Sequence, residues 1–208
     1  MATTLLKNVT FFVFAAFAYV LMVQASDPDI LSDFIIPANM TVIDGSFFTF
    51  TGFRGILDSE MPTSYKGTQA SLKEFPALNG QSVSMAVLQF PPSGINPPHT
   101  RPHSTGLLLL VEGSLEVGFI DTTNKLYNQT LQAGDIFIFP KSLVHYQYNA
   151  SPTEPAIAIA AFGSASSGSV SVPSTIFTSG IDDLILARSF KTDIATIQKI
   201  KAGLVSKA

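Results

Sequence analysis

The stretch Ser93–Gly113 reads SGINPPHTRPHSTGLLLLVEG, and the fold is decided here. It holds His99 and His103, two of the three histidines in a chain of 208 residues. The third, His145, ends a second segment of similar character, GDIFIFPKSLVH at 134–145. A chain that keeps its only imidazoles in two short strand-like segments is expected to use them together.

The residues around His99 predict a stiff strand that aims two side chains at one point. His99 and Arg101 are two positions apart, so in a strand their side chains project to the same face. Pro97 and Pro98 cannot donate ladder hydrogen bonds, and they rigidify the entry into that strand. The fully apolar run 107–111 that follows is typical of a strand buried on both faces.

Strand signals recur at regular spacing along the middle of the chain, each bounded by turn residues. The predicted strands are 83–90, 107–111, 115–119, 125–131, 136–139, 144–148 and 156–162. Short strands at this spacing favour a sandwich or a closed barrel, which leaves no long exposed strand edge. A Ser/Gly tract at 164–171 predicts a linker, and apolar residues at helical spacing from Ile194 to Leu204 predict a C-terminal helix.

The paired motifs resemble those of cupins, and Asn96-Pro97-Pro98-His99-Thr100 is similar to the plant germin-like branch of that family. The resemblance implies an all-β, jelly-roll type cupin barrel with a short C-terminal helical extension. In that branch the first motif supplies two histidines as His-x-His and then a glutamate. The second motif supplies one more histidine, and the four side chains bind manganese inside the barrel. His99 then corresponds to the first ligand and His145 to the ligand of the second motif.

Two of the manganese ligands that the resemblance implies are missing from this chain. Arg101 stands at the position of the second histidine, and Gly106 stands at that of the glutamate. A guanidinium is a permanently charged donor and cannot bind a cation. We therefore expect a weakened manganese site and an anion-binding role for Arg101, for example toward a small carboxylate. His103 is a candidate substitute ligand, and the alternative is a loop histidine near the mouth of the barrel.

Composition bounds the number of domains and the class of partner. The length suits one domain, and 26–208 is predicted to be a single unit with a barrel core at about 80–163 and C-terminal helices at about 180–206. The formal charge is −3 and no Lys/Arg stripe is present, which argues against nucleic acid as a partner. The chain has no cysteine, and Ile35 follows Asp33-Phe34 where the resemblance implies a cysteine.

The N-terminus predicts secretion to the extracellular space. Lys7 precedes an almost unbroken apolar run at 11–23, and compact residues before Ser26 suit cleavage there, so 1–25 is predicted to be a signal peptide. The alternative is a membrane anchor, but the run is shorter than the ~20 apolar residues that span a bilayer. The mature chain is therefore expected to have no membrane span. Asn39 and Asn128 begin sequons for N-glycosylation, which fits a secreted protein.

The sequence offers no competing catalytic constellation, since it has no thiol, no Gly-x-Ser-x-Gly elbow and no phosphate-binding glycine loop. It favours a secreted, apoplastic glycoprotein with a binding or structural role rather than an enzyme. The alternative is a manganese-dependent oxidoreductase of the germin kind, with superoxide dismutase or, less in keeping with the motif, oxalate oxidase activity. The resemblance also implies a homo-oligomer, namely a hexamer.

Overall fold

The structure is a computed structural model that describes residues 27–41, 43–56 and 59–204. The predicted signal peptide therefore lies outside the described residues. The strands are β1 (Lys66–Ala70), β2 (Ser84–Phe90), β3 (Ile95–Thr100), β4 (Gly106–Glu112), β5 (Ser114–Ile120), β6 (Leu126–Gln132), β7 (Ile136–Phe139), β8 (Val144–Tyr148), β9 (Ala156–Phe162) and β10 (Val170–Ser171). The helices are the short 3-10 helix η1 (Pro76–Leu78), then α2 (Val172–Phe177), α3 (Asp183–Ser189) and α4 (Ile194–Leu204).

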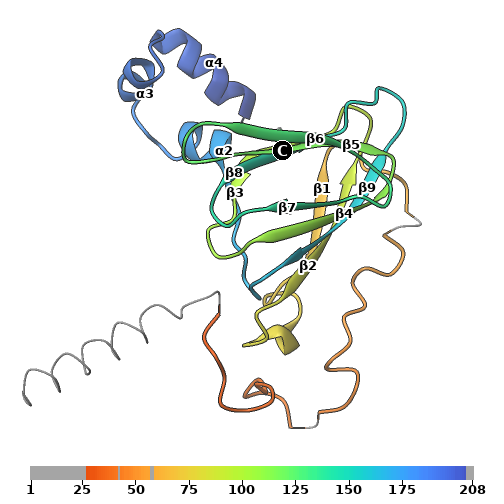
Figure 1. Ribbon diagram of the computed structural model, residues 1–208. Coiled ribbons are helices and arrows are strands. Elements are labelled where there is room, and N and C mark those ends of the chain that lie inside the picture. Colours follow the sequence, from red (N-terminus) through yellow and green to blue (C-terminus); the bar gives the residue numbers. More distant parts are fainter. Residues whose placement is uncertain (1–26, 42, 57–58, 205–208) are drawn as a thin grey trace, which may run out of the picture.

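Two five-stranded antiparallel sheets face each other and enclose the core (Figure 1). One has the order β1-β2-β9-β4-β7, and the other has the order β10-β3-β8-β5-β6. Alternate residues of both sheets fill the space between them, with Phe90, Leu108 and Leu110 from the first and Leu115 and Val117 from the second. This arrangement confirms the prediction of an all-β, jelly-roll type barrel.

Strand β4 differs from its sequence-based prediction. Leu108 and Leu110 point into the barrel and are 1% and 0% exposed, whereas Leu107 and Leu109 point outward and are 46% and 37% exposed. The strand is therefore buried on one face only within this chain. An antiparallel sheet needs to cover only one of its faces to fold, so the continuous apolar run leaves an apolar outer face.

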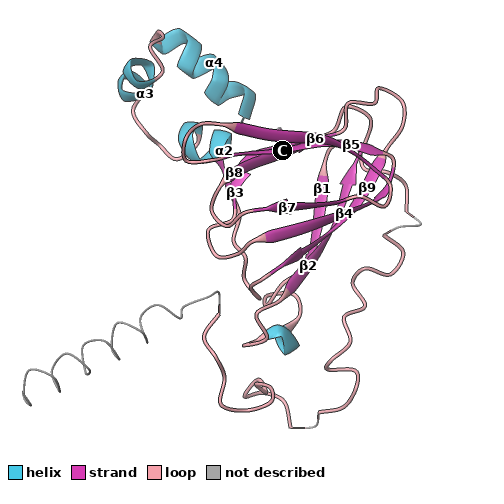
Figure 2. Cartoon of the chain, viewed as in Figure 1, coloured by secondary structure: helices cyan, strands magenta, loops and turns pink. Residues whose placement is uncertain are grey.

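The C-terminal helices form a small unit beside the second sheet (Figure 2). Asp182 caps α3 by accepting hydrogen bonds from two backbone amides, and Leu186, Ala187 and Ile197 are buried between α3 and α4. Asp183 and Lys201 join the two helices by an ion pair of 2.6 Å. The predicted helical extension is confirmed, and no helix in the described part of the chain is long and apolar enough to cross a membrane.

The Ser/Gly tract at 164–171 is not a linker. Ser164, Ala165 and Ser167 are 1%, 3% and 5% exposed. Asp27 accepts hydrogen bonds from Ser164 Oγ at 2.6 Å and from the Ala165 amide at 2.7 Å, and Ser84 Oγ donates to the Ser164 carbonyl. The composition of the tract predicts flexibility, but the small size of its residues lets the backbone pack against the barrel.

Candidate functional site

The two histidine-bearing motifs meet because β3 pairs with β8. His99 lies directly opposite His145 in the antiparallel register, and Asn96 lies opposite Gln147. The register shifts between these two pairs, so the ladder is irregular at Pro97–Pro98. Both imidazoles are buried, at 3% and 2% exposure, and their ring centroids are 4.1 Å apart. The structure thus brings the two predicted cavity histidines side by side.

Local hydrogen bonds fix which nitrogen of each imidazole carries the proton. Nδ1 of His99 lies 2.9 Å from the carbonyl oxygen of Pro97, and Nδ1 of His145 lies 2.9 Å from that of Leu143. A carbonyl oxygen only accepts, so Nδ1 must donate in both rings. Each neutral ring then keeps its lone pair on Nε2, which is the tautomer that suits a metal ligand oriented by its backbone.

Burial keeps both imidazoles neutral. It lowers the pKa of His99 to about 4, and the charge of Arg101 contributes to the lowering. It also lowers the pKa of His145 to about 3, with further lowering from His99 and Arg101. The pair therefore offers two uncharged rings near neutral pH.

Arg101 is buried beside the histidines, with only 6% of its surface exposed. Its Nη1 donates to Ser167 Oγ and to the Gly168 carbonyl, both at 3.1 Å. Its guanidinium carbon lies 4.1 Å from the ring centroid of Phe162, which is a cation–π arrangement. Burial lowers the pKa of Arg101, but an arginine in a protein remains charged. The predicted second ligand position thus holds a fixed positive charge.

Gly106 completes the packing around Arg101. A Cβ at this position would lie 3.4 Å from Cε1 of Phe162, so the ring occupies the space in front of the glycine. The space beside the glycine is wide enough for a Cβ in ordinary contact with the Phe162 ring, and this ring supports the guanidinium. We call Arg101, Gly106, Phe162 and Ser167 the guanidinium unit, and His99 with His145 the imidazole pair.

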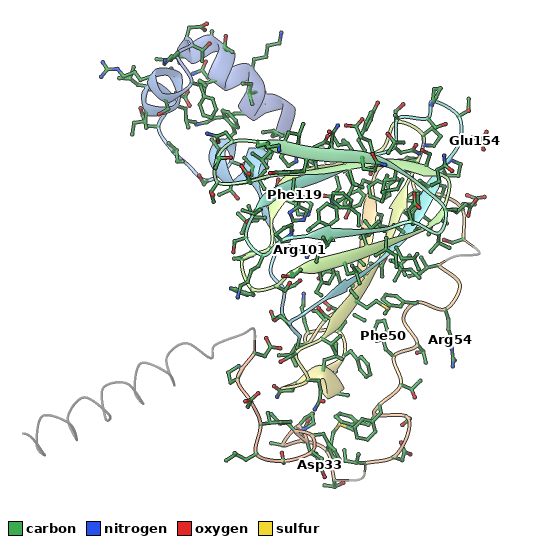
Figure 3. All side chains as sticks on the ribbon, viewed as in Figure 1. Asp33, Phe50, Arg54, Arg101, Phe119 and Glu154 are labelled. Atoms are coloured by element: carbon green, nitrogen blue, oxygen red, sulfur yellow. The ribbon has the colours of Figure 1, made fainter. Side chains whose placement is uncertain are left out.

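A small cavity inside the barrel is lined by residues of both the guanidinium unit and the imidazole pair. Figure 3 labels Arg101 in this region. Its volume is about 10 Å³, which is close to the space that one water molecule needs. Asn96 Nδ2 donates to Gln147 Oε1 at 2.7 Å at its edge. The lining residues are Leu88, Asn96, His99, Arg101, Gly106, Leu107, Leu108, Phe139, His145, Gln147, Ala160 and Phe162.

His103 is not brought to the imidazole pair. It is exposed, its Nδ1 lies 3.0 Å from the Ser166 carbonyl, and its backbone amide donates to the Ser167 carbonyl. Pro102 turns the chain after Arg101, so His103 faces the 164–168 tract. In the part of the chain that the structure describes, no group of three or more His, Cys, Asp or Glu side chains is arranged to hold a metal ion.

The sequence patterns do not predict several residues of the site. Gln147 could have been found by parity, because it lies two positions after His145 on β8 and so shares its face. Asn96 lies in the quoted motif, and the register to Gln147 gives it its role. Phe162 and Ser167 carry no such signal, since their importance comes from the position of Arg101.

The sequon asparagines differ in accessibility. Asn39 and Asn128 are exposed. Asn149, a third asparagine in a sequon, is 0% exposed, and its Nδ2 donates to the carbonyls of Phe90, Pro91 and Glu154. Its side-chain amide is therefore engaged in holding the chain rather than available to an enzyme.

The geometry of the paired motifs agrees with the comparisons with known proteins. The chain matches the cupin family over residues 62–198. It is 59% identical to Germin-like protein 9-3 of Oryza sativa subsp. japonica over 194 residues, which cover 90% of both chains. The chain belongs to the germin-like branch of the cupin family.

More distant relatives support the same assignment. The chain is 34% identical to Germin-like protein subfamily 2 member 4 of Arabidopsis thaliana, covering 94% of this chain and 96% of the relative. A solved structure of oxalate oxidase has a TM-score of 0.75 and 28% identity, and the match covers 88% of this chain and all of the other. Oxalate oxidase in complex with the substrate analogue glycolate matches equally well, with 27% identity.

The residues present do not fit the manganese site of a germin. The imidazole pair supplies two nitrogen donors in the required tautomer, but Gly106 supplies no carboxylate and Arg101 supplies a positive charge. Hard divalent cations favour carboxylate and carbonyl oxygens beside imidazole. The imidazole pair is thus suited to bind a cation, whereas the charge of Arg101 and the missing carboxylate at Gly106 disfavour one.

Proposed function

We propose that this chain is a secreted, extracellular (apoplastic) germin-like glycoprotein with a binding or structural role, in which the manganese site is weakened. The observation that carries the proposal is the buried guanidinium of Arg101, held by Ser167, Gly168 and Phe162 against the cavity. A side chain held by three contacts cannot swing out of the cavity at low cost.

Electrostatics sets the size of the effect on a metal ion. Two like unit charges ~4 Å apart repel by about 4 kcal/mol at an effective dielectric constant of 20, and a divalent ion doubles this repulsion. The loss of a carboxylate ligand adds to it. Two neutral imidazoles do not offset both effects, so we expect manganese affinity to fall by several orders of magnitude relative to a full germin ligand set.

Secretion and glycosylation are parts of the same proposal. They are supported by the apolar run at 11–23, by the sequons at Asn39 and Asn128, and by the exposure of both asparagines. Mass spectrometry of the protein secreted by plant cells would test both points. We expect a mature N-terminus at Ser26 and glycans at Asn39 and Asn128, with Asn149 unmodified.

Assembly into a homo-oligomer, a hexamer by resemblance to the family, is also proposed. Two apolar surfaces support it. Leu107 pairs with Ile138 and Leu109 pairs with Ile136 across β4 and β7, and all four face outward and are exposed. The helical unit likewise exposes Leu184, Ile185 and Phe190. Apolar areas of this kind commonly mark protein interfaces, and light scattering of the purified protein would give the number of subunits.

The alternative is a manganese-dependent oxidoreductase, and one observation favours it. Both imidazoles of the pair already have Nε2 unprotonated and their rings oriented by backbone carbonyls. Such activity would need further ligands beside the imidazole pair: an amide oxygen of Asn96 or Gln147, which line the same cavity, a water molecule, or a carboxylate of another copy.

Metal content decides between the two functions. Elemental mass spectrometry of the secreted protein is expected to find far less than one manganese per chain. The double variant Arg101→His with Gly106→Glu is expected to approach one per chain. Gly106→Ala is the matched control, because a Cβ fits there at 3.4 Å but brings no ligand. Near-stoichiometric manganese in the unaltered protein would overturn the proposal in favour of the oxidoreductase.

A further inference from the structure

The guanidinium of Arg101 has no countercharge among the described residues. No Asp or Glu lines its cavity, and the ion pair found within 4.0 Å in the described part of the chain joins Lys201 and Asp183 instead. A buried charge that lacks a partner of opposite sign is destabilising by several kcal/mol. Such a charge at 6% exposure therefore calls for an anion.

The hydrogen-bond donors of the cavity point to the same conclusion. A guanidinium has five N–H donors on three nitrogens, and Nη1 is the nitrogen that bonds to Ser167 and Gly168. Nε and Nη2 have no hydrogen-bond acceptor among the described residues. Gln147 adds a further NH₂ group, since its oxygen is used by Asn96 and its nitrogen has no partner in the described chain. The cavity thus offers donors from two sides.

The volume of the cavity limits the occupant. About 10 Å³ is enough for one water-sized particle, whereas a carboxylate has at least three heavy atoms. The imidazole pair is uncharged, so it does not repel an anion as carboxylates would. A monatomic anion is therefore closer in size to this cavity than the small carboxylate predicted as a partner of Arg101.

We propose that the cavity beside Arg101 is a binding site for a monatomic anion, a halide such as chloride, held by the free guanidinium nitrogens and the Gln147 amide. The inference rests on the proposed function, because it requires that no divalent cation occupies the same space. The halide balances the charge of Arg101 inside the barrel. It also links the guanidinium unit to Gln147 on β8.

Thermal unfolding of the full secreted protein after dialysis against EDTA provides the first test. Sodium chloride and sodium bromide are expected to raise the melting temperature saturably. Sodium formate and sodium acetate at equal ionic strength are expected to give no saturable rise, because these anions have at least three heavy atoms and the cavity has room for about one. An equal effect of all four salts would overturn the proposal, and so would a formate effect as large as that of chloride.

Two variants separate the site from general charge effects. Arg101→Gln removes the buried guanidinium and is expected to abolish the halide effect. Lys125→Gln is the matched control, since Lys125 also places a cation over an aromatic ring, 4.6 Å from the centroid of Tyr127, but on the surface. It is expected to retain the full effect. A halide effect that persists in Arg101→Gln would contradict the site.

Crystals grown or soaked in sodium bromide decide the case even if Arg101→Gln does not fold. A bromine anomalous peak within hydrogen-bond distance of the Arg101 guanidinium supports the proposal, whereas a water molecule there without an anomalous peak overturns it. The metal content of the same EDTA-dialysed sample keeps the two conclusions apart. Retained manganese would overturn the proposed function. An empty metal site without a halide effect would overturn only the proposal of a halide site.

Discussion

The imidazole pair and the guanidinium unit share one cavity but are held in place by different means. His99 and His145 are each oriented by the backbone carbonyl two residues upstream, that of Pro97 on β3 and that of Leu143 just before β8. Arg101 is oriented by side-chain packing on Phe162 and by hydrogen bonds to Ser167 and Gly168. The orientation of the imidazoles therefore depends on the local backbone, whereas the position of the buried charge depends on contacts with segments far away in the sequence.

The largest loss of stability is expected when the aromatic ring beside the guanidinium unit or beside the imidazole pair is removed. Phe162 supports Arg101, and Phe139 stacks on His145 with ring centroids 4.6 Å apart. Both rings are buried in the core, at 5% and 4% exposure. Phe162→Ala and Phe139→Ala are each expected to lower the free energy of unfolding by about 3–5 kcal/mol, measured by urea denaturation.

The halide response is what distinguishes the two alanine variants. Phe162→Ala should lose the halide-dependent rise in melting temperature, because the guanidinium of Arg101 no longer packs on an aromatic ring. Phe139→Ala should keep that rise despite an equal loss of stability. If both variants lost it, the two halves would act as one unit and the comparison would fail.

The imidazole pair makes the stability of the fold depend on pH. The pKa of His145 is about 3 in the folded chain and ~6.5 in the unfolded chain, so the unfolded state binds more protons between these values. Stability is therefore complete above pH 6.5 and decreases as the pH falls toward 3. Between pH 7 and pH 5, His145 alone should account for a loss of about 2 kcal/mol.

A non-titrating side chain of similar volume tests this assignment. His145→Gln should have a shallower dependence of the urea midpoint on pH over this range than the unaltered protein. Exposed carboxylates contribute equally to both proteins, so the difference between the two curves isolates the histidine. Parallel curves would mean that the imidazole is not buried as the structure shows.

The sequence predicts the imidazole pair, because its position follows from the alternation of side chains along a strand. His99 and His145 occur in motifs of fixed spacing, and strand parity places their side chains on one face. The contacts of Arg101 could not be predicted in this way, because Ser167 and Gly168 lie more than sixty residues away and belong to a tract with no strand or helix pattern. Small polar residues carry the same signal in a flexible linker as in a tightly packed segment.

A single hydroxyl in this tract is expected to help hold Arg101 in place. Ser167 is 5% exposed, and its Oγ accepts a hydrogen bond from the charged Nη1 of Arg101. Ser167→Ala should lower the free energy of unfolding by about 1.5–3 kcal/mol, the range for a hydrogen bond to a charged group, and should weaken the halide response. Ser169→Ala, at an exposed position two residues along the same tract, should change neither. If the two variants proved equally stable, the tract would be the flexible linker that its composition indicates, and Arg101 would be held by Phe162 alone.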